Sequence, residues 1–321
     1  LATALRSPVL GYCIRRLAQA VVVMFIVAVI VFIVLHALPG GLVRAQLGPK
    51  ATAYAVREFT IQQGLNKPLV VQFGIWLSRV LRGNLGFSYK QNQTVVSLLA
   101  AYVPRTLLLV GSSMLIALAI AVPMGMIQGL RRNHLDDQGI TAAMLICYTT
   151  PSFLMGSVLI VVFSIWTNIA PSNASDFGTG TWVDFKDLVL PVLTLVLGNV
   201  SYFSRYMRSA TIDSLLADYV RTARAKGDPT SRILVHHVLR NAFSSTMTLI
   251  GLAVPYVFSG SLIIEALFDF PGVGLLFWNA AQNRDYPVLL GVVLVVTLAT
   301  VIGNLLADLG YAWLDPRVRL K

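Results

Sequence analysis

The chain has 321 residues, of which 56% are hydrophobic and 12% charged, and its mean hydropathy is +0.73. An ordinary soluble domain carries about 25% charged residues, so this composition excludes that class and indicates a polytopic membrane protein. The net charge of +11 is then first a topology signal, because Lys and Arg concentrate in cytoplasmic loops. The two cysteines, Cys13 and Cys147, offer neither a disulfide framework nor a metal-binding spacing, and we interpret both as small apolar packing residues.

The first apolar run extends from Leu17 to Leu38 and follows Arg15 and Arg16. At roughly 1.5 Å per residue, it is long enough to cross a hydrocarbon core of about 30 Å. A signal peptide is the alternative, but the run is longer than a usual h-region and further apolar spans follow. We therefore predict that residues 1–38 comprise the N-terminus and a first transmembrane helix.

A polar insertion occupies residues 39–103. After Pro68, apolar residues recur with the spacing of one helix face, at Phe73, Trp76, Leu77, Val80 and Leu81. The pattern predicts a small external cap that contains amphipathic helices. A solvated loop with only a packing role is the alternative for any single residue in it.

The remaining residues, 104–321, contain five more apolar spans, at about 106–130, 140–169, 188–203, 246–264 and 288–306. The sequence thus predicts an all-α membrane protein with six transmembrane helices, a long insertion after the first and a charged loop between the fourth and fifth. Most Lys and Arg residues lie at the N-terminus, at Arg131 and Arg132, in that loop and in the tail. By the positive-inside rule, both termini and the loop are predicted to be cytoplasmic.

Several kinds of chemistry have no sequence signature here. The central parts of the six spans carry no Asp, Glu, Lys or Arg, although ion-coupled transporters usually need ionisable groups at that depth. There is no phosphate-binding G-x-x-x-x-G-K-[ST] motif and no G-x-S-x-G nucleophile motif. His236 and His237 are adjacent, so on a helix they point roughly 100° apart and do not readily share a metal. The sequence therefore predicts neither a catalytic nor a metal site, and any ATP must be bound by another chain.

The charged loop, residues 213–241, is predicted to form two short helices. Apolar residues share the first helix face at Ile212, Leu215, Leu216, Tyr219, Val220 and Ala223. Gly227 suits the left-handed position after a helix, and Asp228 with Pro229 suits the N-cap and first position of a second helix. Ile233, Leu234, Val238 and Leu239 form the apolar stripe of that helix. An amphipathic pair on the membrane surface is one alternative. A DNA-reading helix-turn-helix is disfavoured by the flanking spans.

The same loop carries a family resemblance. Residues 219–227 read YVRTARAKG and residues 237–242 read HVLRNA, which resembles the EAA loop of ABC-importer permeases of the dipeptide/oligopeptide/nickel branch. In that family the loop contains a coupling helix that docks on an ATPase subunit. The resemblance assigns this role to Tyr219, Val220, Arg221, Thr222, Ala223, Arg224, Ala225, Lys226, Gly227 and Asp228. Asp228 and Pro229 depart from the branch, which commonly has a leucine and then a polar residue there.

Other segments extend the resemblance over nearly the whole chain. Residues 14–17 (IRRL), 38–40 (LPG), 64–69 (GLNKPL), 83–89 (GNLGFSY) and 314–319 (LDPRVR) match the branch. The loop between the fifth and sixth spans resembles the pattern E-x-x-F-x-x-P-G-x-G followed by R-D-Y-P. The family places this loop externally, near the gate and the docked binding protein. The residues implied are Glu265, Phe268, Pro271, Gly272, Gly274, Arg284 and Asp285.

The resemblance also implies the assembly. A permease of this branch pairs with a second homologous permease, binds two cytoplasmic ATPase subunits that hold ATP and Mg²⁺, and receives substrate from an external binding protein or lipoprotein. Its place is the bacterial plasma membrane, in contact with lipid and without nucleic acid. The implied substrates are di- and oligopeptides, and nickel chelates, glutathione or haem-like cofactors are alternatives. No cofactor is expected in this chain.

Two functions from other classes stay open from the sequence: an ion-coupled secondary transporter or channel, and a structural membrane subunit that anchors a cytoplasmic partner. A substrate pathway is a weaker hypothesis. Polar or aromatic residues inside apolar spans are candidates to line it, namely Tyr148, Thr149, Asn199 and Tyr202. Hydrogen bonding between helices is the alternative role for each of them.

Overall fold

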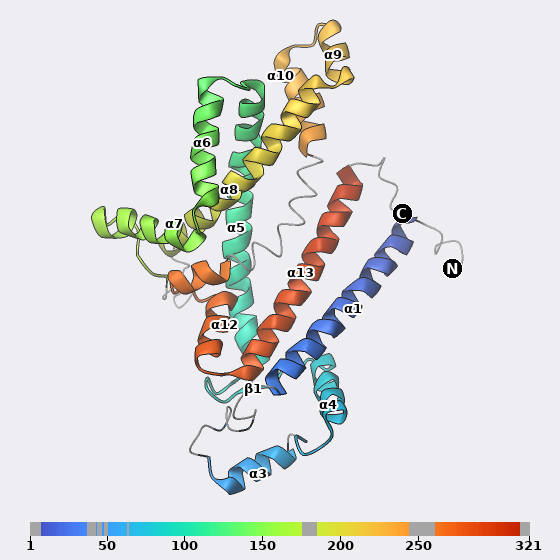
Figure 1. The fold of residues 1–321 in the computed structure, drawn as a ribbon, viewed down its shortest axis with the longest axis vertical. Coiled ribbons are helices and arrows are strands. Elements are labelled where there is room, and N and C mark those ends of the chain that lie inside the picture. The colour runs from blue at the N-terminus through green and yellow to red at the C-terminus, as the bar shows by residue number, and fades with distance from the viewer. Residues whose placement is uncertain are drawn as a thin grey trace. The chain divides into compact units, whose positions relative to one another are not determined.

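The computed structural model describes residues 8–36, 43, 47, 51–62, 64–174, 185–243 and 261–314. These residues are mostly helical (Figure 1). The chain divides into two compact units. The first unit comprises Leu1–Arg105, Gly272–Ile302 and Leu320–Lys321, and the second unit comprises Thr106–Pro271 and Gly303–Arg319.

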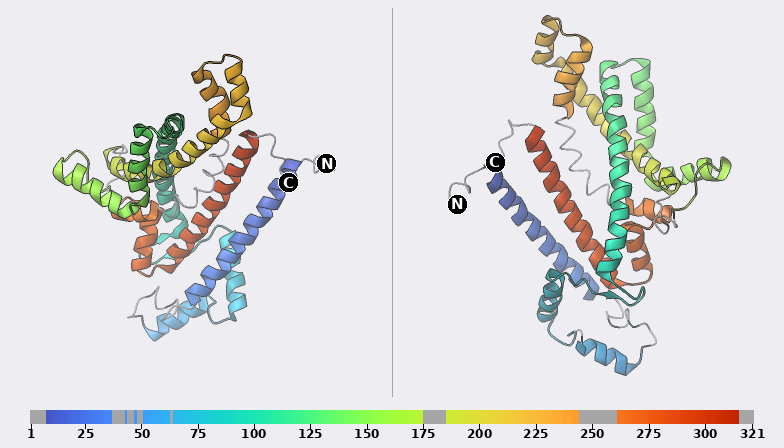
Figure 2. Two further views of the ribbon diagram at one scale, coloured as in Figure 1. Left: turned by 45° about the horizontal axis from the view of Figure 1, so that its top comes forward. Right: turned by 180° about the vertical axis from the view of Figure 1, so that it is seen from behind.

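The first unit combines long apolar helices with the polar insertion. Its elements are α1 (Pro8–His36), α3 (Ala53–Gln62), α4 (Leu69–Leu81), β1 (Phe87–Ser88), β2 (Gln93–Thr94), the start of α5 (Val95–Leu130), α12 (Val273–Gln282) and most of α13 (Tyr286–Leu314). The two strands form an antiparallel hairpin in which Phe87 lies opposite Thr94. Helices α1 and α13 run side by side in both views of Figure 2, and Val31 of α1 packs against Tyr286 and Leu290 of α13.

An aromatic cluster joins the insertion to the first span. The ring of Phe32 in α1 lies 5.3 Å from the ring of Phe73 and 5.9 Å from that of Trp76, both in α4. This contact confirms the central part of the predicted helix face. Leu81, the last residue of α4, is 79% exposed.

The second unit contains the rest of α5 together with α6 (Leu135–Thr149), α7 (Ser152–Leu159), the π-helix η2 (Ile160–Trp166), α8 (Phe185–Leu216), α9 (Asp218–Ala225), α10 (Thr230–Arg232) and the π-helix η3 (Ile233–Val238). Helices α5 and α8 continue across Pro123 and Pro191. Their contact buries apolar side chains, including Ala117 and Ala121 of α5 and Val200 and Phe203 of α8. Burial of these apolar groups makes α8 the central helix of the unit.

Four helices in the described part of the chain are long and apolar enough to cross a membrane. They cover Arg15–Val34, Val95–Leu130, Phe185–Leu216 and Tyr286–Leu305. These helices confirm the first, second, fourth and sixth predicted spans. The fifth, at 246–264, lies outside the described residues except for 261–264, which are helical and belong to a stretch that ends at Leu267.

The third predicted span, at 140–169, is not one straight helix. Helix α6 ends at Thr149, and α7 with η2 leaves it at an angle of 105°. The cause is local, since Pro151 has no N–H to donate and its ring favours an extended conformation for Thr150, which has φ −75° and ψ 124°. The chain therefore has a broken span or a re-entrant loop here.

Candidate functional site

The charged loop forms a helical hairpin, defined as residues 218–243. Its first helix is separate from α8, because Ala217 is extended, with φ −72° and ψ 149°. The prediction of one helix face running from Ile212 to Ala223 was therefore wrong at this break. The break redirects the chain, so that Leu216 is 62% exposed rather than aligned with the buried Val220.

Gly227 ends α9 in the conformation that the sequence predicts. Its φ is +85°, in the left-handed region, where glycine has no Cβ to clash. The Gly227 N–H donates to the Arg224 carbonyl at 3.0 Å, and the Asp228 N–H donates to the Ala223 carbonyl at 3.2 Å. These are the two hydrogen bonds of a Schellman motif, so the turn is closed by the backbone itself.

The second helix begins one residue later than predicted. Pro229 occupies the N-cap position with ψ 149°, and Asp228 makes no capping hydrogen bond. Asp228 is already held as the last residue of the Schellman motif, so its carboxylate points along the second helix instead. There it lies 3.4 Å from Arg232 and 3.9 Å from Nε2 of His237.

The hairpin has a small hydrophobic core of its own. Val220 and Ala223 of α9 pack against Ile233 and Val238 of η3. On the outside of α9, Tyr219 is 39% exposed, and Arg221, Thr222, Arg224, Ala225 and Lys226 are also exposed. Arg221 also forms an ion pair with Asp218, with 3.5 Å between Nη1 and Oδ1. Both side chains are exposed to solvent, so this pair contributes little to stability. The hairpin thus presents an aromatic ring and basic groups on a scaffold with its own core, against which Leu215 of α8 also packs.

The predicted external loop divides between the two units. In the second unit, Glu265 and Phe268 are fully buried, and the Thr106 hydroxyl donates to Oε1 of Glu265 at 2.9 Å. Asp269 has φ +51°, which turns the chain toward Pro271. Both Glu265 and Phe268 therefore lie inside the fold, with no surface presented to a docked protein.

In the first unit, Gly272 is the N-cap residue of α12 and Gly274 is buried in its first turn. Arg284 ends this helix with φ +54°, which is unusual for a residue other than glycine. Asp285 is 4% exposed and accepts a hydrogen bond from the buried Ser88 hydroxyl of β1. The pair ties the loop before α13 to the strand hairpin.

We expect Ser88→Ala to loosen this connection, because the buried carboxylate of Asp285 then loses a hydrogen bond. Such a loss costs about 1–3 kcal/mol. Hydrogen exchange of the purified chain should show faster exchange in residues 87–94. Ser97→Ala, at an exposed hydroxyl that bonds to Thr94, is the control and should leave this exchange unchanged. Equal exchange in both variants would contradict the structural role of Ser88.

The four candidate pathway residues lie on α6 and α8. Tyr148 is 49% exposed, and the guanidinium of Arg205 lies 4.7 Å from the centre of its ring. The Thr149 hydroxyl donates to the backbone carbonyls of Leu145 and Ile146 in its own helix. Asn199 is buried, and the ring of Tyr202 contacts that of Phe203 edge to face and that of Tyr206 at a tilt. Their role in a pathway stays a prediction.

A cavity of about 620 Å³ lies within the first unit. His36 at its wall contacts the Phe32 carbonyl at 2.8 Å and Oε1 of Gln72 at 2.9 Å. Aromatic rings line much of the rest, including those of Phe59, Trp76, Tyr89 and Tyr286. Within the described ranges, no group of three or more His, Cys, Asp or Glu residues is arranged to hold a metal ion.

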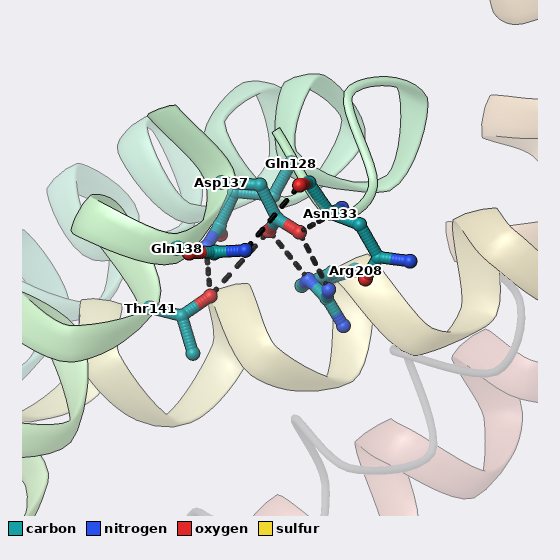
Figure 3. A network of polar contacts seen from close by, with 6 residues as sticks. All are labelled: Gln128, Asn133, Asp137, Gln138, Thr141 and Arg208. Atoms are coloured by element: carbon teal, nitrogen blue, oxygen red, sulfur yellow. Dashed lines mark hydrogen bonds and ion pairs between the residues drawn. The ribbon is translucent and has the colours of Figure 1, made fainter. Parts of the chain in front are cut away.

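Sequence reasoning missed a buried ion pair in the second unit. Asp137, in the first turn of α6, is 2% exposed and pairs with Arg208 of α8 (Figure 3). The Thr141 hydroxyl lies 3.4 Å from the same carboxylate and accepts a hydrogen bond of 3.1 Å from Gln128. The only sign of this pair in the sequence was an acidic residue between the second and third predicted spans. Nothing in the sequence indicated which basic residue it pairs with.

Sequence reasoning also missed a close crossing of α5 and α8. Gly125 and Gly129 in α5 have the G-x-x-x-G spacing that brings membrane helices together. A Cβ on Gly125 would lie 2.7 Å from the Cβ of Met207 and from the backbone oxygen of Ser204. A Cβ on Gly129 would lie 2.6 Å from Cγ2 of Thr211. The two backbones therefore touch at this crossing.

Curated relatives match the chain over nearly its full length. A Brucella ovis protein named a peptide permease is 37% identical over 319 residues, covering 97% of this chain and 99% of that protein. The oligopeptide transport system permease protein AppB of Bacillus subtilis is 35% identical, covering 96% and 99%. The glutathione transport system permease protein GsiC of Escherichia coli K12 is 33% identical, covering 97% and 100%.

A solved structure shares the fold. The inward-facing MetNI methionine ABC transporter has a chain that matches with a TM-score of 0.56 and 14% identity, covering 68% of this chain and 96% of that one. Two family models also match. Residues 9–110 match the N-terminal membrane component of binding-protein-dependent transport systems, and residues 121–320 match the inner membrane component. The chain therefore belongs to the family of binding-protein-dependent transport system inner membrane components and is a permease of the ABC-importer class.

Proposed function

We propose that this permease imports di- and oligopeptides, driven by ATP that separate subunits hydrolyse. The observation that carries the proposal is the helical hairpin, whose own core and backbone-closed turn present Tyr219 and Arg221 to solvent. A short rigid helix of this kind can dock in a cleft of an ATPase and follow its closure. Two of the relatives are named for peptide or oligopeptide transport, which supports the substrate class.

The proposed assembly contains two permeases, two cytoplasmic ATPase subunits that hold ATP and Mg²⁺, and an external binding protein. This chain would contribute six spans, with both termini and the hairpin in the cytoplasm. The family description, which names binding-protein dependence and the inner membrane, supports the external partner and the location. The concentration of Lys and Arg in the hairpin and termini supports the orientation.

The hairpin would act as a mechanical link. Its exposed basic residues and Tyr219 would contact the ATPase, while Val220 and Ala223 keep α9 fixed to η3. The backbone hydrogen bonds at Gly227 close the turn that follows α9. Closure of the ATPase would therefore move the hairpin as a rigid body and alter the access of the pathway between the spans.

Glutathione is the second candidate substrate, because the relative from Escherichia coli K12 is named for glutathione transport at 33% identity. Uptake assays on the complete transporter, with labelled dipeptide, labelled oligopeptide and labelled glutathione, distinguish the two. Saturable uptake of the peptides and not of glutathione supports the proposal. Uptake of glutathione alone would overturn the peptide assignment.

Replacing both exposed contact residues, Tyr219→Ala with Arg221→Glu, should release the ATPase subunits. The ring supplies apolar contact area and the guanidinium supplies a charge, so we expect copurification of the ATPase to fall about tenfold or more. The measurement is quantitative recovery of ATPase with the affinity-tagged chain from membranes.

The control is Arg132→Glu, which reverses an exposed positive charge on the same predicted side but outside the hairpin. It should leave ATPase recovery close to that of the wild type. Undiminished recovery with the double variant would show that the hairpin is not the docking site.

A further inference from the structure

The ion pair of Figure 3 joins α6 to α8 with defined geometry. Nε of Arg208 donates to Oδ1 of Asp137, and Nη2 donates to Oδ2, each at 2.7 Å. Two parallel hydrogen bonds between a guanidinium and a carboxylate restrict orientation as well as distance. The start of α6 therefore cannot rotate relative to α8 without breaking at least one of them.

Asp137 is also part of the turn that connects α5 to α6. The backbone N–H of Asn133 donates to Oδ2 of Asp137 at 2.9 Å, and Asn133 itself adopts a left-handed φ of +67°. The carboxylate is 2% exposed, whereas Arg208 is 27% exposed. One buried carboxylate thus holds the turn and α8 together, unlike a solvated surface pair.

The close crossing of α5 and α8 lies at the same level of α8 as Arg208. The α5 glycines contact the segment from Ser204 to Thr211, which contains Arg208. The backbone contact with α5 and the ion pair with α6 both fall on this segment of α8. Close backbone packing and an ion pair therefore hold these three helices together near Arg208.

Helix α8 continues without a break to Leu216, and α9 begins two positions later. Arg208 lies about two helical turns before that end. Helix α8 also packs against both α9 and η3. A displacement of the hairpin would therefore be carried to Arg208 along one continuous helix.

We infer that the Asp137–Arg208 pair transmits movement of the helical hairpin from α8 to α5 and α6. The inference rests on the proposed function, since it assumes that the hairpin follows an ATPase. Neither residue is assigned a contact with substrate, so both are positioning residues. Without the pair, α8 would move with the hairpin while α6 lagged behind, and ATP hydrolysis would be coupled less efficiently to transport.

The test is the number of peptides taken up per ATP hydrolysed by the complete transporter in proteoliposomes. We expect Asp137→Asn and Arg208→Gln each to lower this ratio about tenfold, because residues in one ion-pair network are strongly coupled. Arg208→Lys keeps the charge but not the parallel hydrogen bonds, and should lie between Arg208→Gln and the wild type. A purely structural role would lower the amount of assembled complex and leave the ratio unchanged.

The matched control is Asp136→Asn. Asp136 precedes Asp137 in the same helical turn and pairs with Arg131, but both side chains are exposed, at 45% and 63%. This variant should keep the wild-type ratio. A wild-type ratio in Asp137→Asn and Arg208→Gln would overturn the inference. If those variants fail to assemble, Arg208→Lys decides, since a lowered ratio supports the inference and a wild-type ratio overturns it.

The wild-type transporter separates failure of this inference from failure of the proposed function. Absence of ATP-dependent peptide uptake in the wild type would overturn the proposed function itself. Wild-type uptake together with unchanged ratios in the Asp137 and Arg208 variants would overturn only the role of the ion pair.

Discussion

Gly227→Val is expected to separate ATP hydrolysis from transport while the spans remain inserted in the membrane. Gly227 has φ +85°, a conformation that costs an L-residue about 1–2 kcal/mol and a β-branched residue more. No atom lies within 4 Å of the position of a new Cβ, so the effect arises from the backbone and not from a clash. A strain of this size corresponds to a roughly tenfold loss of the docking conformation. Peptide uptake and peptide-stimulated ATPase activity should be measured on the same proteoliposomes.

Two controls isolate the backbone effect. Gly227→Asn adds a side chain that tolerates the left-handed region and should keep most of the uptake. Gly139→Val introduces valine at a helical glycine of α6 that also has open space around it and no positive φ. Normal coupling in Gly227→Val would show that the turn does not need this conformation.

Gly125→Val is expected to have the largest effect on stability. Its Cβ alone would lie 2.7 Å from the backbone oxygen of Ser204 and 2.9 Å from the Arg208 nitrogen, neither of which can move by rotating a side chain. Overpacking of this kind costs about 1–3 kcal/mol or more, because the helices must separate. Thermal unfolding of the purified chain in detergent should occur at a clearly lower temperature, with less chain recovered from membranes.

Gly111→Val is the matched control for the helix crossing. Gly111 lies in the same helix, α5, but no atom would come within 4 Å of its Cβ. The valine there tests the general effect of a β-branched residue in this helix, without the contact to α8. An equal loss of stability in Gly111→Val and Gly125→Val would contradict the close packing of α5 and α8.

The hairpin shows how far local reasoning extends. Gly227 could be assigned to a left-handed turn from its position after an apolar stripe, and the two backbone hydrogen bonds confirm it. The same reasoning failed at Ala217, where the stripe continues in the sequence but the helix does not. Periodicity reports which side chains suit one face, and it does not report where tertiary packing redirects the chain.

The loop before the last span shows a different limit. Resemblance places Glu265 and Asp285 on an external loop, which stays a prediction, but it does not reveal that both side chains are buried, with Thr106 and Ser88 as partners. Acidic residues in a short turn are normally solvated, so only the positions of their distant partners reveal that these carboxylates are enclosed.

The sequence by itself determined the membrane class, the positions of four confirmed spans, the hairpin with its Gly227 turn, and the family, because these depend on composition and on residues near one another in the chain. The tertiary structure alone decided the contact of Gly125 with Ser204 and the pairing of Asp137 with Arg208. The last two residues are 71 positions apart, and no local pattern specifies such a partner. A buried charge is stable only beside its counterpart, so the packing of α6 on α8 determines where that pair forms.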